Sequence, residues 1–417
     1  MKSILTVFCC LSLAAVCFAQ EVELTPIETL EQRTQTIDES LKVLQKLKVS
    51  GYIQTQYQWG EKDASLKVGS GNGNRDESFD RFGIRRGRIK FTYEDGIASG
   101  VFQLDITEKG VGIKDAYLGV KDPWMGTNIL KAGVFDRTFG NEISYSSSLR
   151  ESPERSTIFQ TLFPEERDLG AAITLQASKT SPWNFLKLEA GLFAGNGIKQ
   201  ETDNRKDFIG HLSASRNIGS EAKWGLGVSY YNGGVFQGNE NVYKIEGKAF
   251  VLDKNSDNKG KFAKREYIGF DGQFSVMSVL GLTKIRAEYL FGTQPATSSN
   301  SKSPNSSTAI IADTYIRNFS GGYIIFVQDL GQLPLSAVVK YDWYDPNIDV
   351  AKNDVGLNGT GSADMKQNTL GLGMLWRVNN NIRLQAYYDF NSNEKTDNLA
   401  VSNIKSDVFT LRLQYKF

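Results

Sequence analysis

The feature that most constrains the fold is an alternation of apolar and polar side chains that recurs along almost the whole chain. In the segment Gly83–Tyr93, Ile89 and Phe91 alternate with Arg88 and Lys90. Successive side chains of a β-strand point to opposite faces, so this segment predicts a strand with one apolar and one cationic face. The stretches GVFQLDIT, NFLKLEAGLFAG, LTKIRAEYLFGT and VFTLRLQYKF alternate in the same way.

The predicted strands are too long for an ordinary soluble sheet. They run for roughly 10–13 residues, whereas strands of soluble proteins average about five or six. One face is apolar and the other carries charge on strand after strand, which is typical of a transmembrane β-barrel with a polar lumen. Short connections at 94–97 and 377–380 alternate with long polar loops at 60–80, 294–312 and 346–366.

The number of strands follows from the phase of the connections. Seventeen segments alternate, but including 241–252 puts long and short connections out of phase, and bacterial barrels have an even number of strands. We therefore expect 241–252 to form a hairpin arm in an external loop. The predicted fold is all-β, an antiparallel transmembrane β-barrel of 16 strands over 47–417, with a short N-terminal periplasmic helix.

The N-terminal residues predict export. Residues 1–19 contain one lysine, an apolar run and a small residue at Ala19, which is the pattern of a secretory signal peptide. All three cysteines lie in it, so we expect no disulfide and no thiolate chemistry in the mature chain. Cleavage would lower the net charge from +1 to 0, which does not favour a nucleic-acid partner. We expect no cofactor and no bound metal.

Residues 20–46 predict a periplasmic helical segment. Apolar side chains and one threonine recur at heptad positions in Ile27, Leu30, Thr34, Ile37, Leu41 and Leu44. This pattern favours either an amphipathic helix packed on its own chain or a short coiled coil that joins protomers.

The parity of the charged strand 81–93 assigns its two faces. Ile89, Phe91 and Tyr93 would face lipid, because a lysine or arginine there would cost about 2–4 kcal/mol at the midplane. Arg86, Arg88 and Lys90 would then face the lumen. Arg85 has the outward parity, and we expect it near the external interface.

The predicted lumen is positively charged. In these registers fifteen basic and nine acidic side chains point inward, a surplus of six positive charges in a nearly neutral chain. Rings of arginine and lysine favour anions in pores. The candidate pore-lining residues are Arg86, Arg88, Lys90, Lys131, Arg137, Lys284 and Arg286.

One long connection, residues 138–166, is the candidate constriction. It mixes apolar residues with charges, and the candidate constriction residues in and next to it are Arg150, Glu151, Glu154, Arg155 and Arg167. A loop of this length in a compact protein is usually functional. The favoured interpretation is a loop folded into the barrel that narrows it, and the alternative is an external loop that caps the mouth.

Several of these stretches resemble the phosphate-selective porins O and P. The similar segments are RRGRIKFTYED, IKDAYLGV (113–120), AGVFDRTFG (132–140), ESPERS and FPEERDLGA (163–171). The resemblance implies a trimeric 16-stranded barrel in the outer membrane of a Gram-negative bacterium. Asp136 and Thr138 stand where the family motif often has lysine and proline, so we interpret the chain as an anion-leaning porin rather than a phosphate channel.

The expected function is passive diffusion of small hydrophilic solutes. Expected partners are outer-membrane lipid, small anions such as phosphate, two further copies in a homotrimer, and the barrel-assembly machinery, which would read the C-terminal Phe417. The alternative is a structural or adhesive barrel with functional external loops. An enzyme is not expected, because His211 is the sole histidine and no Gly-x-Ser-x-Gly motif lies near it.

Overall fold

The computed structural model describes residues 30, 33–36, 38, 41–42, 45–74, 76–303, 312–399 and 404–417. The chain divides into two compact units, Met1–Leu47 and Lys48–Phe417. In the first unit the described residues from Leu30 to Lys46 are helical. The signal peptide and the heptad positions Ile27, Ile37 and Leu44 lie outside the described residues, so both remain predictions. No helix in the described part of the chain is both long and apolar enough to cross a bilayer.

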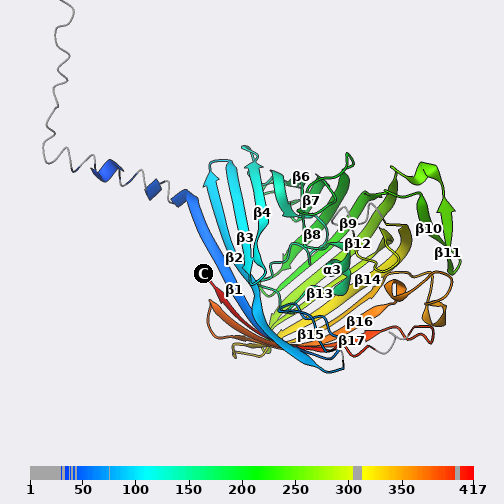
Figure 1. Cartoon of the computed structure of the whole chain (residues 1–417). Coiled ribbons are helices and arrows are strands. Elements are labelled where there is room, and N and C mark those ends of the chain that lie inside the picture. The colour runs from blue at the N-terminus through cyan, green and yellow to red at the C-terminus, as the bar shows by residue number, and fades with distance from the viewer. Residues whose placement is uncertain are drawn as a thin grey trace, which may run out of the picture. The chain divides into compact units, whose positions relative to one another are not determined.

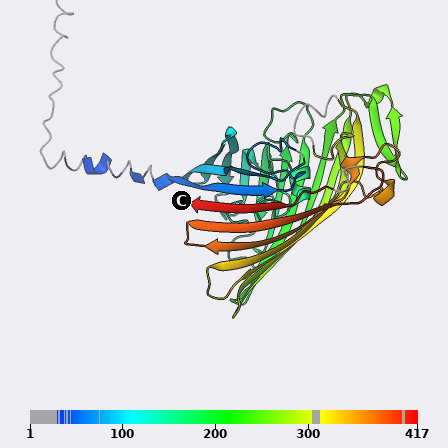
Figure 2. The same ribbon diagram turned by 60° about the horizontal axis from the view of Figure 1, so that its bottom comes forward.

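Sixteen strands of the described chain form a closed antiparallel barrel (Figure 1). Each strand pairs with the next, and the last one pairs with the first, as Figure 2 shows. The predicted fold class is confirmed. The strands are β1 (Leu47–Gly60), β2 (Phe79–Asp95), β3 (Ala98–Thr107), β4 (Gly110–Lys121), β5 (Ile129–Asp136), β6 (Arg167–Gln176), β7 (Leu186–Phe193), β8 (Asp207–Ile218), β9 (Ala222–Phe236), β12 (Phe262–Ser278), β13 (Gly281–Ala296), β14 (Thr314–Asp329), β15 (Leu335–Asp345), β16 (Gln367–Arg377), β17 (Ile382–Asn393) and β18 (Val408–Lys416).

Two further strands form a hairpin outside the wall. β10 (Asn241–Glu246) pairs with β11 (Ala249–Lys254), while β9 pairs directly with β12. β10 runs parallel to the start of β14, where the rings of Tyr243 and Tyr315 stack 4.3 Å apart. The hairpin stands beside the barrel in Figure 1. The predicted demotion of residues 241–252 from the barrel is therefore confirmed.

Four short helical turns lie in the connections. The α-helix α3 (Thr157–Leu162) belongs to the connection between β5 and β6. The 3-10 turns are η1 (Ser256–Asn258), η2 (Lys352–Asp354) and η3 (Ser362–Asp364). Connections at one end of the barrel are short turns, and those at the other end are mostly long loops. By the asymmetry of outer-membrane barrels, the long-loop end is external and the short-turn end is periplasmic.

The two faces of β2 follow the predicted parity. Phe91 and Tyr93 are 37% and 41% exposed, whereas Arg86 and Arg88 are 3% and 6% exposed. Outward-facing aromatic rings gather near the external end, where Tyr289 stacks on Trp343 of β15. An apolar outer surface with an aromatic girdle is the form that a barrel takes in lipid.

Arg85 corrects the parity prediction. Its guanidinium donates to the Glu154 carboxylate inside the barrel, with both distances 2.8 Å. The reason is local. β3 pairs with β2 only up to Arg88 and ends at Thr107, so Arg85 lies beyond the end of its neighbouring strand. Phe82 and Ile84 are 79% and 39% exposed although they share the parity of the buried Arg86, so the alternation shifts by one residue here and turns Arg85 inward.

The apolar core lies inside the barrel rather than between two layers. Aromatic residues of the β5–β6 connection, including Phe139, Phe159 and Phe163, are buried against inward-facing tyrosines. The Phe163 ring makes edge contacts with Tyr231 and Tyr267 at 6.0 and 5.7 Å. The inner wall is therefore apolar on the side where this connection packs, in contrast to the uniformly polar lumen that the alternation predicts.

Candidate constriction inside the barrel

The connection between β5 and β6, called here the inward segment (residues 138–166), starts and ends against the inner wall. A buried ion pair between Arg137 and Asp168, 3.0 Å long, joins the two strands at its base. The backbone amides of Gly140 and Asn141 donate to Ser229 and Glu288 at 2.9 and 3.1 Å. Gly140 has a φ of 58°, and a Cβ there would lie 2.1 Å from a Glu288 oxygen, so glycine is required.

The inward segment also contacts the wall at β2 and β18, through Glu154. This carboxylate accepts hydrogen bonds from Arg85, Arg86 and Arg412, each 2.8 Å long. Burial favours the neutral acid, but the three guanidinium groups outweigh it and hold the pKa of Glu154 well below its usual range. Glu154 is therefore ionised at neutral pH and ties the segment to β2 and β18.

Arg88 is the next arginine along β2, and it also contacts the inward segment. Its guanidinium donates to the Ser147 hydroxyl at 3.0 Å and lies 3.4 Å from Asp105 of β3. The predicted cationic row thus points inward, but Arg86 and Arg88 are covered by the segment instead of standing free in water. Lys90 has no ion-pair partner among the described residues.

Glu151 carries a second contact between the segment and the wall. Its carboxylate binds Arg286 of β13, and the ammonium of Lys284 lies 3.6 Å away. Gln385 of β17 donates to the Glu151 backbone carbonyl. The two pore-lining candidates on β13 are therefore brought together with the predicted loop residue Glu151.

Glu166 organises the far end of the segment. It pairs with Lys114 at 2.7 Å, with Arg167 at 3.0 Å, and with Arg155. Arg167 also binds Asp115 of β4 at 2.9 Å. Burial opposes the charge of Glu166, yet these cations lower its pKa well below the usual range.

Glu166 and Lys114 are functional candidates that the sequence did not indicate. By strict alternation with its neighbours in β4, Lys114 would point outward. A register shift between Gln103 and Leu104 of β3 turns it inward instead. A β-bulge re-aims side chains in this way. Alternation alone carries no signal for a bulge.

Arg150 differs from the other candidates because no carboxylate pairs with it in the described chain. It is buried, its Nη2 donates to the Tyr145 carbonyl at 3.3 Å, and its Nε and Nη1 atoms have no hydrogen-bond partner among the described residues. Lys131 likewise has aromatic neighbours, Tyr117 and Phe135, and no carboxylate contact among the described residues. No group of three or more metal-ligating side chains occurs among the residues that the structure describes.

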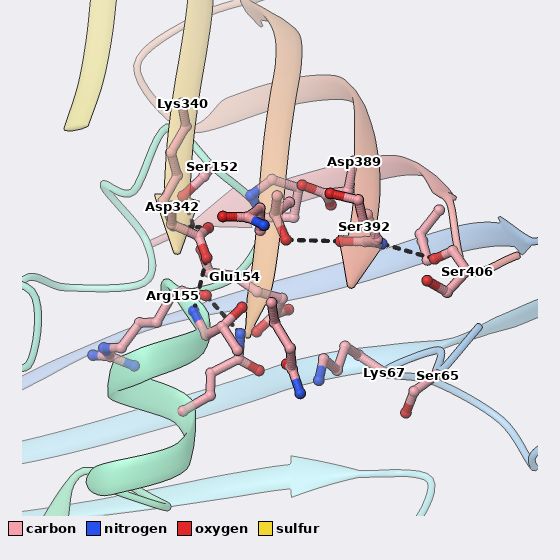
Figure 3. A pocket seen from close by; sticks show the side chains of 18 of the residues that line it. Ser65, Lys67, Ser152, Glu154, Arg155, Lys340, Asp342, Asp389, Ser392 and Ser406 are labelled. Carbon is pink, nitrogen blue, oxygen red and sulfur yellow. Dashed lines mark hydrogen bonds and ion pairs between the residues drawn. The ribbon is translucent and has the colours of Figure 1, made fainter. Parts of the chain in front are cut away.

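Three cavities adjoin the inward segment. The largest, about 470 Å³, opens among external residues and is the one seen in Figure 3. A second, about 290 Å³, lies along Arg85, Arg86 and Arg88. Glu154, Arg155 and Gln160 line both of these cavities.

The third cavity is much smaller and lies deeper. Its volume is about 20 Å³, close to that of a single water site. Ser152 and Lys340 line both this cavity and the largest one. Arg150 lines this cavity but not the largest one. The described side chains therefore leave room for about one water molecule at this depth.

The lipid-compatible outer face, the closed ladder and the charged interior together define an outer-membrane β-barrel protein of a Gram-negative bacterium. No protein-family model matches the chain, and no curated protein matches it. Solved structures do match it.

Pseudomonas putida OprB aligns with a TM-score of 0.57 and 10% identity over 93% of this chain and 96% of that one. Salmonella typhi OmpF, in a complex with daunomycin, aligns with a TM-score of 0.55 and 13% identity over 89% and 97%. The outer membrane channel DcaP of Acinetobacter baumannii aligns with a TM-score of 0.53 and 12% identity over the same shares. At these identities the likeness establishes a shared fold.

Proposed function

We propose that the protein is a passive diffusion channel for small hydrophilic solutes, with the inward segment as its constriction. The observation that carries this proposal is the position of Glu154, which binds β2 and β18 inside the barrel and lines two cavities. The fold shared with the channel DcaP supports it. We further propose a homotrimer, on the heptads of residues 27–44 and on the family resemblance.

The proposed selectivity leans toward anions. The inward segment adds five glutamates and two arginines, so it lowers the positive surplus of the lumen by three. Arg85 and Lys114, which the predicted surplus of six did not include, add two positive charges. Several arginines of the wall are paired with glutamates of the inward segment. Lys90, Lys131, Lys223 and Arg383 have inward parity and no carboxylate within ion-pair distance among the described residues. These four cations would set the potential of the periplasmic half, and phosphate is one of the anions to test.

The small cavity beside Arg150 is too small to serve as the passage by itself. It holds about one water, so a hydrated ion needs another route past the segment or a movement of the segment. The same observation is what a structural or adhesive barrel would show. Electrical conductance separates the two functions, because a barrel without a pathway does not conduct.

The experiment is single-channel recording of purified protein in planar bilayers. We expect discrete openings, and a reversal potential in a KCl gradient that indicates a chloride preference over potassium. Replacing KCl by potassium phosphate tests whether phosphate permeates. Absence of any conductance from correctly folded protein would contradict the channel function, and a potassium preference would contradict the anion preference alone.

A further inference from the structure

The largest of these cavities is lined by two opposite charges without a hydrogen bond or ion pair in the described chain. They are the Lys67 ammonium and the Asp389 carboxylate. The other charged side chains at this cavity have partners among the described residues, as Glu154 has in its three arginines. Figure 3 shows Lys67 and Asp389 on different elements that face the same space.

Both charges are held in place by their backbones. The Lys67 amide donates to the Gln58 side chain of β1 at 2.7 Å, and the following residue, Val68, is buried. Asp389 lies within β17, between Gly371 of β16 and Val408 of β18. Neither flanking residue can neutralise the carboxylate. An unpaired charge kept in a fixed position beside a cavity is suited to bind a ligand of opposite charge.

The remaining lining combines charged side chains that have partners, those of Asp63, Glu154, Arg155, Lys340 and Asp342, with polar neutral ones. Amides and hydroxyls dominate it, for example those of Gln160, Asn391 and Ser392. No aromatic side chain is among the described residues that line this cavity, so the stacking surface typical of a ring ligand is missing. The volume of about 470 Å³ is sufficient for a molecule of amino-acid or dipeptide size.

We propose that this cavity is an external binding site for small zwitterions, that is, free amino acids and short peptides. The ligand carboxylate binds the Lys67 ammonium, and the ligand ammonium binds the Asp389 carboxylate. A simple ion satisfies one of the two charges, whereas a zwitterion satisfies both at once. The inference rests on the proposed diffusion function for its biological meaning, because the site would concentrate zwitterions at the channel entrance.

The test is isothermal titration of detergent-purified protein at about pH 7.5, where aspartate and lysine are ordinarily charged and the ligand α-amino groups are still mostly protonated. Glycylglycine is compared with N-acetylglycine, which carries only the negative charge, and with glycinamide, which carries only the positive one. We expect glycylglycine to bind roughly tenfold or more tightly than either analogue, since one charge-assisted contact is lost in each. Equal affinities for the three compounds, or no binding, would overturn the proposal.

Single substitutions test which residue binds the ligand carboxylate and which binds the ligand ammonium. Lys67→Gln should remove the preference over glycinamide, and Asp389→Asn should remove the preference over N-acetylglycine. Lys302→Gln is the matched control, because Lys302 lines the second cavity and not this one, and no ion pair of its ammonium is seen in the described chain. An equal loss in the control would overturn the assignment.

The exchanged double variant Lys67→Asp/Asp389→Lys provides a second test. A zwitterion can bind in the reverse orientation, so much of the lost affinity should return, although each single exchange alone should abolish it. No recovery in a variant that keeps its heat-modifiable gel mobility would overturn the proposal. Glycylglycine binding to a protein without conductance would contradict the channel function and leave the binding site standing.

Discussion

At the scale of single residues, the basic side chains of the lumen fall into two groups. Arg86 and Arg88 bind the inward segment through Glu154 and Ser147. Lys90 and Lys131 lie farther toward the periplasm and are not paired with carboxylates in the described chain. The arginines are therefore expected to hold structure, and the lysines to set the potential.

The variant Lys90→Glu/Lys131→Glu should lower the chloride-to-potassium permeability ratio. It changes the charge of the periplasmic half by four units without removing a contact to the inward segment. The effect should be largest at low salt and fade near 1 M, where the Debye length is about 3 Å. Reversal potentials at several KCl concentrations measure it. A ratio that does not move toward potassium would place these lysines outside the conducting path.

Replacing Glu154 by glutamine should release the tip of the inward segment. Three guanidinium groups would lose their counter-charge, and breaking a buried ion pair costs about 3–5 kcal/mol. Single-channel conductance or open probability should rise. Glu165→Gln is the control, because the Glu165 side chain is exposed and no partner of its carboxylate is seen in the described chain. Unchanged conductance in Glu154→Gln would show that this contact does not limit the passage.

The pH dependence of this contact follows from the lowered pKa of Glu154. A carboxylate with a depressed pKa stabilises the folded arrangement above its unfolded pKa, about 4.3, and loses that contribution as the pH falls through the lowered value. Between about pH 7 and pH 5 the contact should therefore persist. If the Glu154 contact limits the passage, the single-channel conductance of the wild type should therefore not change over this pH range.

At the scale of elements, the strands could be predicted because lipid imposes a strict alternation on them. The outward orientation of Phe91 followed from that constraint. The exclusion of residues 241–252 followed from the phase of the connections and from the even number of strands in bacterial barrels. The contacts of the inward segment could not be predicted. Glu154 and Arg412 are 258 residues apart in sequence, and no local pattern joins them. Arg85 and Lys114 depart from alternation at a strand end and a bulge, which depend on the neighbouring strand.

The buried apolar residues of the inward segment should hold the segment against the wall as firmly as its ion pairs do. Phe159 and Phe163 are fully buried and pack against each other and against wall tyrosines. Phe159→Ala should cost about 3–5 kcal/mol of local stability, as truncation of a buried phenylalanine usually does. Limited proteolysis of the folded protein should then cut within residues 138–166. Leu149→Ala, at an exposed position of the same segment, should leave it resistant.

At the scale of the whole molecule, assembly into trimers remains a prediction that rests on the N-terminal heptads. Leu30 and Leu41, the described apolar positions of the seam, are exposed in the single chain. The variant Ile37→Asp/Leu44→Asp would put charge into the predicted seam and should weaken the oligomer. Native gel mobility and light scattering in detergent report it. A trimer of unchanged stability would mean that the barrel walls, and not the helices, hold the protomers together.

Phe417 extends the pairing of β1 with β18 that closes the barrel. Phe417 exchanges two backbone hydrogen bonds of 3.0 Å with Gly51 of β1, at the periplasmic end of the β1–β18 pairing. A Cβ on Gly51 would lie 2.5 Å from the Phe417 ring, so the two residues fit only as they are. Phe417 also completes the outward alternation of Leu411, Leu413 and Tyr415.

Deleting Phe417 should therefore lower the amount of assembled barrel for two reasons. Two ladder bonds at the seam are lost, and the terminal aromatic residue that we expect the assembly machinery to read is removed. Refolding in detergent isolates the first cause, because no assembly machinery is present there. We expect a small decrease in refolding yield and a much larger decrease of heat-modifiable protein in outer-membrane fractions. Equal decreases would assign the effect to the seam alone, and unchanged yield in the membrane would refute the predicted recognition of Phe417.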